Sequence, residues 1–185
     1  KLRAALLGAV AVLGLAPAAF AERGTDGEVK LTFPQAVSIM NPYLSGGTKD
    51  IYASSMVLEP LAGLDPNGVM VPKLVTEIPT LENGGISADM TSITWKLLPD
   101  LKWSDGSAVT ADDAVFTWQY CTHPEGGCSQ ATKFEGVASV EAVDPSTIKV
   151  TFAAPKANPY TAFVSALSPV LQKAQFEACL GAAAP

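Results

Sequence analysis

The chain has 185 residues, of which 48% are apolar, enough for a substantial core. This length permits one domain, or one domain and a small part of a second. The 18 acidic residues outnumber the 12 basic ones and give a formal net charge of −6. Because no basic stripe is present to contact a phosphate backbone, the composition excludes nucleic acid as a partner.

The first 21 residues have the pattern of a secretory signal peptide. Lys1 and Arg3 form a basic start, an apolar run follows over Ala4–Leu15, and small residues at Ala19 and Ala21 mark a cleavage point. The run is too short for a comfortable membrane span. No Cys follows it that could carry a lipid. We therefore expect residues 1–21 to direct export to the periplasm without a lipid anchor.

The next elements are a strand, a loop and a helix. Alternating side chains predict a strand over Val29–Phe33. Asn-Pro and Gly-Gly pairs mark a loop over residues 38–50, and apolar residues at helical spacing predict a helix over Ile51–Leu58. A turn over residues 64–68 then leads into a short strand or extended segment over Val69–Leu74.

The middle of the chain predicts a strand, a tight turn and a capped helix. Apolar and polar residues alternate from Ile93 to Leu97, which is typical of a strand with one buried face. A turn follows at residues 104–106. Thr110 is a good N-cap, and Asp113, three residues later, can accept a hydrogen bond from the Thr110 amide as in a capping box.

Two alternating runs, Val137–Val143 and Thr147–Phe152, flank an Asp-Pro-Ser turn and predict a β-hairpin or meander. Two helices are then expected, over Tyr160–Leu171 and Gln172–Leu180, split by Ser168-Pro169.

Three cysteines agree with an exported protein. Cys121 and Cys128 enclose six residues rich in Pro and Gly, so a local disulfide is expected in an oxidising compartment. Cys179 is left over, and we expect its partner beyond residue 185. His123 lies between the paired cysteines, but three ligands with this spacing match no common zinc site.

No other group of residues predicts catalysis. The chain has a single His and no G-x-S-x-G motif. Asp112 and Asp113 occupy a first helical turn, where the helix dipole explains their charge. The glycine pairs match neither phosphate-binding pattern. We therefore expect no enzyme activity and no cofactor.

The run ITWKLLPDLKWSDGSAVTADDAVFTWQY resembles the signature of the family 5 extracellular solute-binding proteins, which capture peptides and related solutes for ABC importers. The matching positions, which are expected to build the fold rather than touch ligand, are Trp103, Asp105, Gly106, Thr110, Ala111, Asp113 and Trp118. The phrases LAGLDPNGVMVPKL and VASVEAVDPSTIKVTFAAP also resemble the family.

The resemblance implies an α/β fold, α+β within this chain, that is part of a two-lobe periplasmic-binding-protein type II architecture. Residues 22–58 would be the first part of lobe I, and residues 59–185 an incomplete extra domain of the family. The second lobe would be absent, so we expect an N-terminal fragment.

In the family, the loop after the first strand lines the ligand cleft. The resemblance therefore implies that Ser45, Gly46, Gly47 and Thr48 face the ligand, with Tyr43 and Asn41 as further candidates. Glycines let main-chain groups approach an extended peptide and pair with its backbone. The alternative is a plain surface turn, with Tyr43 packed on the core and Asn41 capping the turn.

The implied function is a monomeric, periplasmic solute-binding component that captures oligopeptides and delivers them to an ABC permease at the inner membrane. The same fold could instead bind nickel, an oligosaccharide or an opine. From other classes, the alternatives are a secreted disulfide-bearing interaction module without a transport role and a zinc hydrolase built on Cys121, His123 and Cys128.

Overall fold

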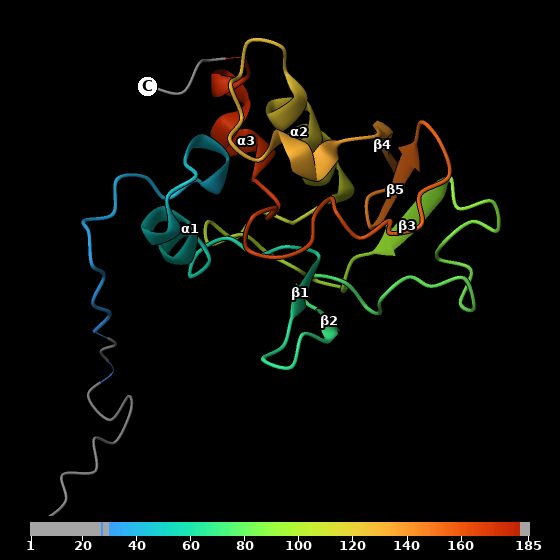
Figure 1. Cartoon of the computed structure of the whole chain (residues 1–185), viewed down its shortest axis with the longest axis horizontal. Helices are drawn as coiled ribbons and strands as arrows, with labels where there is room; N and C mark the ends of the chain where they lie inside the picture. The colour runs from blue at the N-terminus through green and yellow to red at the C-terminus, as the bar shows by residue number, and fades with distance from the viewer. Residues whose placement is uncertain (1–26, 28–29, 182–185) are drawn as a thin grey trace, which may run out of the picture. The chain divides into compact units, whose positions relative to one another are not determined.

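The computed structural model describes residue 27 and residues 30–181 (Figure 1). The predicted signal peptide, residues 1–21, lies outside the described residues. Contacts divide the chain into two units, Lys1–Thr32 and Phe33–Pro185, and the second unit contains every helix and strand in the described part. The fold described below is that of the second unit.

Three antiparallel strands in the order β3-β5-β4 form the main sheet. They are β3 (Ser92–Lys96), β4 (Val137–Asp144) and β5 (Thr147–Phe152). Trp95 pairs with Ile148 and Ile93 with Val150, and all four side chains are buried. The predicted strand with one buried face is therefore confirmed, because successive side chains of a strand point to opposite faces and the apolar ones here share the buried face.

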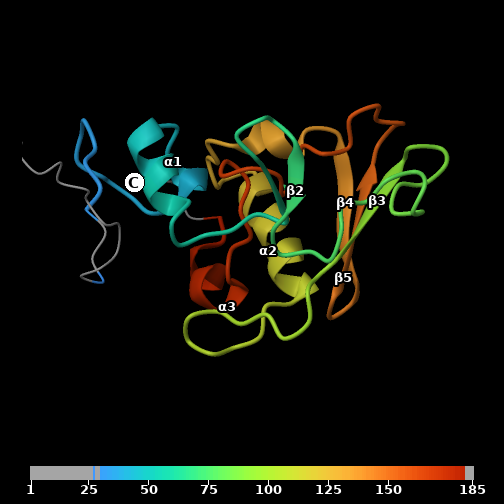
Figure 2. The ribbon, with the colours of Figure 1, turned by 90° about the horizontal axis from the view of Figure 1, so that it is seen from below.

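The main helix, α2 (Ala111–Thr122), packs on β4 and β5 and contacts α3 (Lys173–Phe176) (Figure 2). As predicted, Thr110 is its N-cap residue, and the Thr110 amide donates to Asp113 Oδ2 at 2.9 Å. Phe116 and Tyr120 are buried on its inner face. The β4–β5 hairpin and the strand–turn–helix unit are thus both confirmed.

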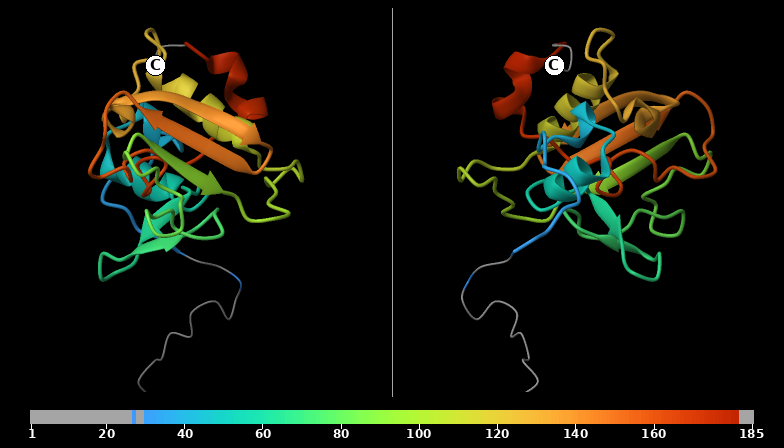
Figure 3. Two further views of the ribbon diagram at one scale, coloured as in Figure 1. Left: turned by 90° about the vertical axis from the view of Figure 1, so that its right-hand side faces the viewer. Right: turned by 60° about the vertical axis from the view of Figure 1, so that its left-hand side comes forward.

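Two smaller strands, β1 (Ala62–Leu64) and β2 (Met70–Pro72), form a second antiparallel sheet (Figure 3). The predicted turn between them is present, since the Asp65 carboxylate accepts hydrogen bonds from the Asn67 and Val69 amides. The predicted strand over Val69–Leu74 is correct but shorter.

The expected helix over Tyr160–Leu171 is wrong. Phe163 and Ser165 have positive φ angles of 60° and 73°, which a helix does not allow. The backbone of this segment pairs instead with Leu61 and Ala62: the Leu61 amide donates to the Phe163 carbonyl at 2.9 Å, and the Ser165 amide donates to the Ala62 carbonyl at 2.9 Å. Tertiary pairing therefore overrides the local apolar spacing.

Three further boundaries differ from expectation. Helix α1 covers Thr48–Ser54 rather than Ile51–Leu58, because the Gly47 carbonyl accepts from the Asp50 and Ile51 amides and starts the helix early. The helix expected over Gln172–Leu180 is α3 followed by a 3-10 turn at Glu177–Cys179. Residues 30–33 contain no strand, so the described part of the predicted strand Val29–Phe33 is wrong; alternation makes a strand only beside a pairing partner.

Candidate functional site

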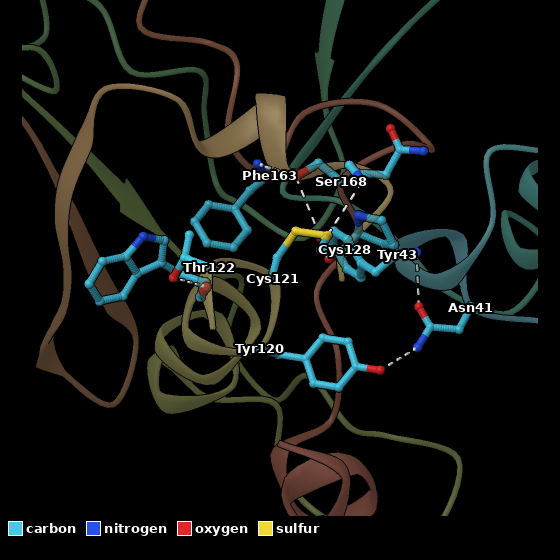
Figure 4. The surroundings of a disulfide bond; sticks show 11 residues. Asn41, Tyr43, Tyr120, Cys121, Thr122, Cys128, Phe163 and Ser168 are labelled. Atoms are coloured by element: carbon cyan, nitrogen blue, oxygen red, sulfur yellow. Dashed lines mark hydrogen bonds between the residues drawn. A yellow bond between two sulfur atoms is a disulfide. The ribbon is translucent and has the colours of Figure 1, made fainter. Parts of the chain in front are cut away.

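The loop before α1 contains five of the six candidate ligand-binding residues, and the sixth, Thr48, is the first residue of α1. The first half of this loop is built into the core. Asn41 Oδ1 accepts from the Tyr43 amide at 3.0 Å and starts a 3-10 turn at Pro42–Leu44. Asn41 Nδ2 donates to the Tyr120 hydroxyl at 3.4 Å (Figure 4). Both Asn41 and Tyr43 are buried, so their side chains anchor the loop to the core.

Tyr43 is the deepest side chain of this loop. Its ring packs near those of Tyr120 and Phe134, with centroids 6.5 Å and 6.3 Å away. Its hydroxyl donates to the Pro169 carbonyl. Burial raises the pKa of the Tyr43 phenol, so this group stays neutral.

The second half of the loop, with Thr48 at the start of α1, lies at the surface. Gly46 and Thr48 are exposed, and Ser45 and Gly47 are half-buried. Ser45 and Gly47 have extended backbone conformations, with φ/ψ of −146°/134° and −75°/128°. The amide and carbonyl of Gly46 make no hydrogen bond to any described residue, and a Cβ there would meet no atom within 4 Å. The loop therefore offers accessible, unused main-chain groups.

Asp50 fastens this loop, and sequence reasoning missed that role. Its carboxylate accepts from the Ser38 amide at 2.7 Å, from Ser45 Oγ at 2.7 Å and from Lys49 Nζ at 2.8 and 2.9 Å. The hydrogen bond from Lys49, followed by those from Ser38 and Ser45, holds the pKa of Asp50 far below its usual range. The only local signal was the Lys-Asp pair itself.

The carboxylate of Asp50 is saturated by its own loop. It is 2% exposed, and a hollow of about 410 Å³ opens beside it. The hollow is lined by Ser38, Ile39, Leu44, Ser45, Gly47, Lys49 and Asp50. Because the charged groups here already bind each other, Asp50 and Lys49 shape the loop rather than offer free charges to a solute.

Cys121 and Cys128 form a disulfide, with Cα atoms 5.1 Å apart. Both sulfurs are therefore unavailable as zinc ligands, which removes the zinc hydrolase built on Cys121, His123 and Cys128. His123 Nδ1 instead accepts from the Glu125 amide at 3.2 Å. Among the described residues, Cys179 is the one free cysteine, and it is exposed.

The signature residues make internal bonds, as their expected scaffold role requires. The Asp113 carboxylate accepts from Trp103 Nε1 at 3.2 Å, from the Thr110 amide at 2.9 Å and from the Lys173 amide at 2.8 Å. Asp105 accepts from Gln172 Nε2 at 2.7 Å. These carboxylates join α2 and its preceding turn to α3.

The fold matches part of solute-binding proteins of known structure. Haemophilus influenzae OppA in complex with the peptide RPPGFSPFR aligns with a TM-score of 0.67 at 22% identity, over 75% of this chain and 29% of OppA. Campylobacter jejuni NikZ in complex with Ni(L-His) aligns with a TM-score of 0.63 at 30% identity, over 77% of this chain and 27% of NikZ. The fold is therefore a mixed α/β unit that matches part of OppA-type binding-protein structures.

Sequence comparison agrees. Residues 69–181 match the bacterial extracellular solute-binding proteins, family 5 Middle, and this chain belongs to that family of binding proteins, which are not enzymes. The glutathione-binding protein GsiB of Escherichia coli O1:K1 / APEC is 24% identical over 159 residues, 86% of this chain and 28% of GsiB. The chain thus spans less than a third of the length of such relatives. Within the described residues, none of the helices is long and apolar enough to cross a membrane.

Proposed function

We propose that this chain is part of the periplasmic solute-binding component of an ABC importer, that its cargo is oligopeptide, and that it delivers this cargo to the membrane permease. Family membership gives the binding role. Peptide cargo is favoured by the peptide bound to the OppA neighbour and by the glutathione named for the GsiB relative. Export would depend on residues 1–21 as a signal peptide.

The observation that carries this proposal is the unused main chain at Gly46. An extended peptide is recognised most economically by backbone pairing, as an added strand pairs with a sheet edge. Extended conformation at Ser45 and Gly47, with free polar groups between them, fits that mode. Such contacts ignore the side chains of the peptide, which suits varied cargo. In this proposal Ser45–Thr48 face the ligand, while Asn41 and Tyr43 position them.

The proposed architecture follows the family. Residues 22–58 would form the first part of lobe I, residues 59–185 the extra domain, and further chain the opposing lobe. Ligand binding would then shift the population toward a form in which the two lobes close around the cargo. The closed form would dock on the permease as a monomer.

A second cargo is a nickel complex, because the NikZ neighbour binds Ni(L-His) and is 30% identical over the shared region. Mass spectrometry of material that co-purifies with the full-length protein separates the two. We expect short peptides. A nickel chelate, a sugar or an opine in their place would overturn the oligopeptide assignment.

Substitution of Gly46 tests the loop itself. Because a Cβ at Gly46 meets nothing within 4 Å, Gly46→Trp should leave the fold intact but cover the main chain, and should weaken peptide affinity about tenfold or more, roughly 1.4 kcal/mol. Titration calorimetry with the co-purified peptide measures this. Gly46→Ala is the matched control and should bind nearly as the wild type does. Equal affinity in Gly46→Trp would remove the loop from the site.

A further inference from the structure

The disulfide lies beside Tyr43, in the buried first half of the candidate ligand-binding loop (Figure 4). The residue before Cys121 is Tyr120, whose hydroxyl accepts from Asn41 Nδ2 at 3.4 Å. The residue after Cys128 is Ser129, whose amide donates to the Tyr43 carbonyl at 2.8 Å. The residues next to the two cysteines, Tyr120 and Ser129, therefore each make a hydrogen bond to the 3-10 turn at Pro42–Leu44 or to its N-cap residue, Asn41.

One end of the bridge is fixed independently of it. Cys121 belongs to the last turn of α2, which packs on the main sheet through buried residues. Tyr120 also packs against Phe116 and Phe176, with ring centroids 5.9 Å and 6.3 Å away. Helix α2 is thus a rigid reference to which the bridge can tie another segment.

The other end depends on the bridge. Residues 123–127, His-Pro-Glu-Gly-Gly, form a turn closed by the Gly126 amide donating to the His123 carbonyl at 3.0 Å. Gly127 has a positive φ of 60°, and a chain with two adjacent glycines has many alternative conformations. Without the bridge, Cys128 would be joined to α2 only through this flexible turn, and the Ser129 amide would be held by the packing of Phe134 rather than by a covalent link to α2.

The segment that follows Cys128 supports Tyr43 twice. Ser129 holds its carbonyl, and Phe134, in the 3-10 turn at Ala131–Phe134, packs against its ring. Tyr43 is two residues before Ser45, the start of the surface half of the loop. A displacement of Ser129 or Phe134 would therefore move Tyr43, and with it the proposed ligand-facing backbone two residues further on.

We propose that the Cys121–Cys128 disulfide is a positioning element of the binding site: it fixes Ser129 against Tyr43 and so keeps Ser45–Thr48 in the conformation that binds solute. This inference rests on the proposed function of the loop. A loop that occupies the binding-competent conformation for a smaller fraction of time binds more weakly in proportion to that fraction. Loss of the bridge should therefore reduce affinity without a change in any group that touches the ligand.

The experiment uses the full-length protein with the double substitution Cys121→Ser and Cys128→Ser. Hydrogen exchange followed by mass spectrometry should show the hydrogen-bonded amides of Tyr43, Leu44 and Gly47 exchanging faster, by a factor that exceeds the acceleration in β3–β5 about tenfold. Affinity for the tripeptide trialanine should fall about threefold to tenfold. If the variant does not fold, brief reduction of the folded wild type with a phosphine gives the same two readouts.

A matched control separates positioning from general loss of stability. Ile148→Val trims a buried side chain in β5, far from the loop in sequence, and should lower the melting temperature while leaving affinity and loop exchange unchanged. The proposal is overturned if removal of the bridge speeds exchange of the loop no more than that of the sheet. It is equally overturned if affinity falls to the same extent in Ile148→Val.

The exchange measurement needs no ligand, so the inference and the proposed function can fail separately. Wild-type protein that does not bind trialanine but shows selective loosening of residues 41–48 contradicts the peptide cargo and supports the positioning role of the bridge. Protein that binds the tripeptide equally well with and without the bridge supports the cargo and contradicts the positioning role.

Discussion

Asp50 shows how a charged side chain can be buried at low cost. Its carboxylate is 2% exposed yet accepts hydrogen bonds from Ser38, Ser45 and Lys49, all within twelve residues of it in sequence. A buried charge is tolerated when it is paired and its lone pairs are satisfied. The Asp50 carboxylate therefore links Ser38, before the loop, to Ser45, within it, and fixes their relative positions.

The lowered pKa of Asp50 predicts a pH dependence. A carboxyl whose pKa is depressed in the folded state contributes stability that is present above its unfolded pKa, about 3.9, and is lost as the pH falls toward the folded value. Asp50→Asn should therefore lower the melting temperature at pH 7, and this difference from the wild type should shrink below about pH 4. Asp100→Asn, an exposed turn residue, is the control and should change little at either pH. A difference that is constant with pH would show that the charge of Asp50 does not matter.

Asp113, in the first turn of α2, is a second carboxylate that accepts several hydrogen bonds. Asp113→Ala removes the acceptor for Trp103 Nε1, the Thr110 amide and the Lys173 amide. We expect a loss of about 2–4 kcal/mol in the free energy of unfolding, measured by chemical denaturation. Asp112→Ala, one residue earlier and exposed, should cost less than about 1 kcal/mol. Equal effects would mean that helix-dipole charge, rather than the hydrogen-bond hub, explains both residues.

At the scale of elements, a buried threonine of α2 links the helix to the irregular segment that precedes α3. Thr117 is buried; its hydroxyl donates to the Asp113 carbonyl and accepts from the Leu171 amide at 2.8 Å. Thr117→Val keeps the shape but leaves the Leu171 amide without a partner, which should cost about 1–3 kcal/mol. Thr122→Val is the matched control: its hydroxyl also donates four residues back, but it is exposed, and it should change stability by less than about 0.5 kcal/mol. Similar losses in the two variants would contradict the role of the Leu171 contact.

Elements held by local chemistry were predictable from the sequence. The alternation from Ile93 to Leu97, the Thr110–Asp113 cap and the hairpin around residues 144–146 each depend on neighbours within a few positions. The segment 160–171 was not predictable in this way. Its apolar spacing suits a helix, but its conformation is set by pairing with Leu61 and Ala62, and no local pattern records such a partner.

At the scale of the whole molecule, the candidate site was located by resemblance to the family and not by any pattern in the loop. The sequence contained the Asn-Pro and Gly-Gly pairs, but the burial of Tyr43 beneath them depends on Phe134 and Pro169. The clamp at Asp50 and the contact of Ser129 with Tyr43 likewise join residues that only the fold brings together. The sequence could therefore propose which loop is the candidate site, but it could not predict the contacts that hold that loop.

The pairing of β1 with the segment after Asn158 has a consequence for how the protein is made. The Leu61 amide donates to the Phe163 carbonyl, which is synthesised 102 residues later. At ribosomal rates of roughly 5–20 residues per second, that is a delay of about 5–20 seconds. During this interval Leu61 and Ala62, which are buried in the folded protein, lack the segment that they pair with, so this part of the fold cannot close until residue 163 has been made.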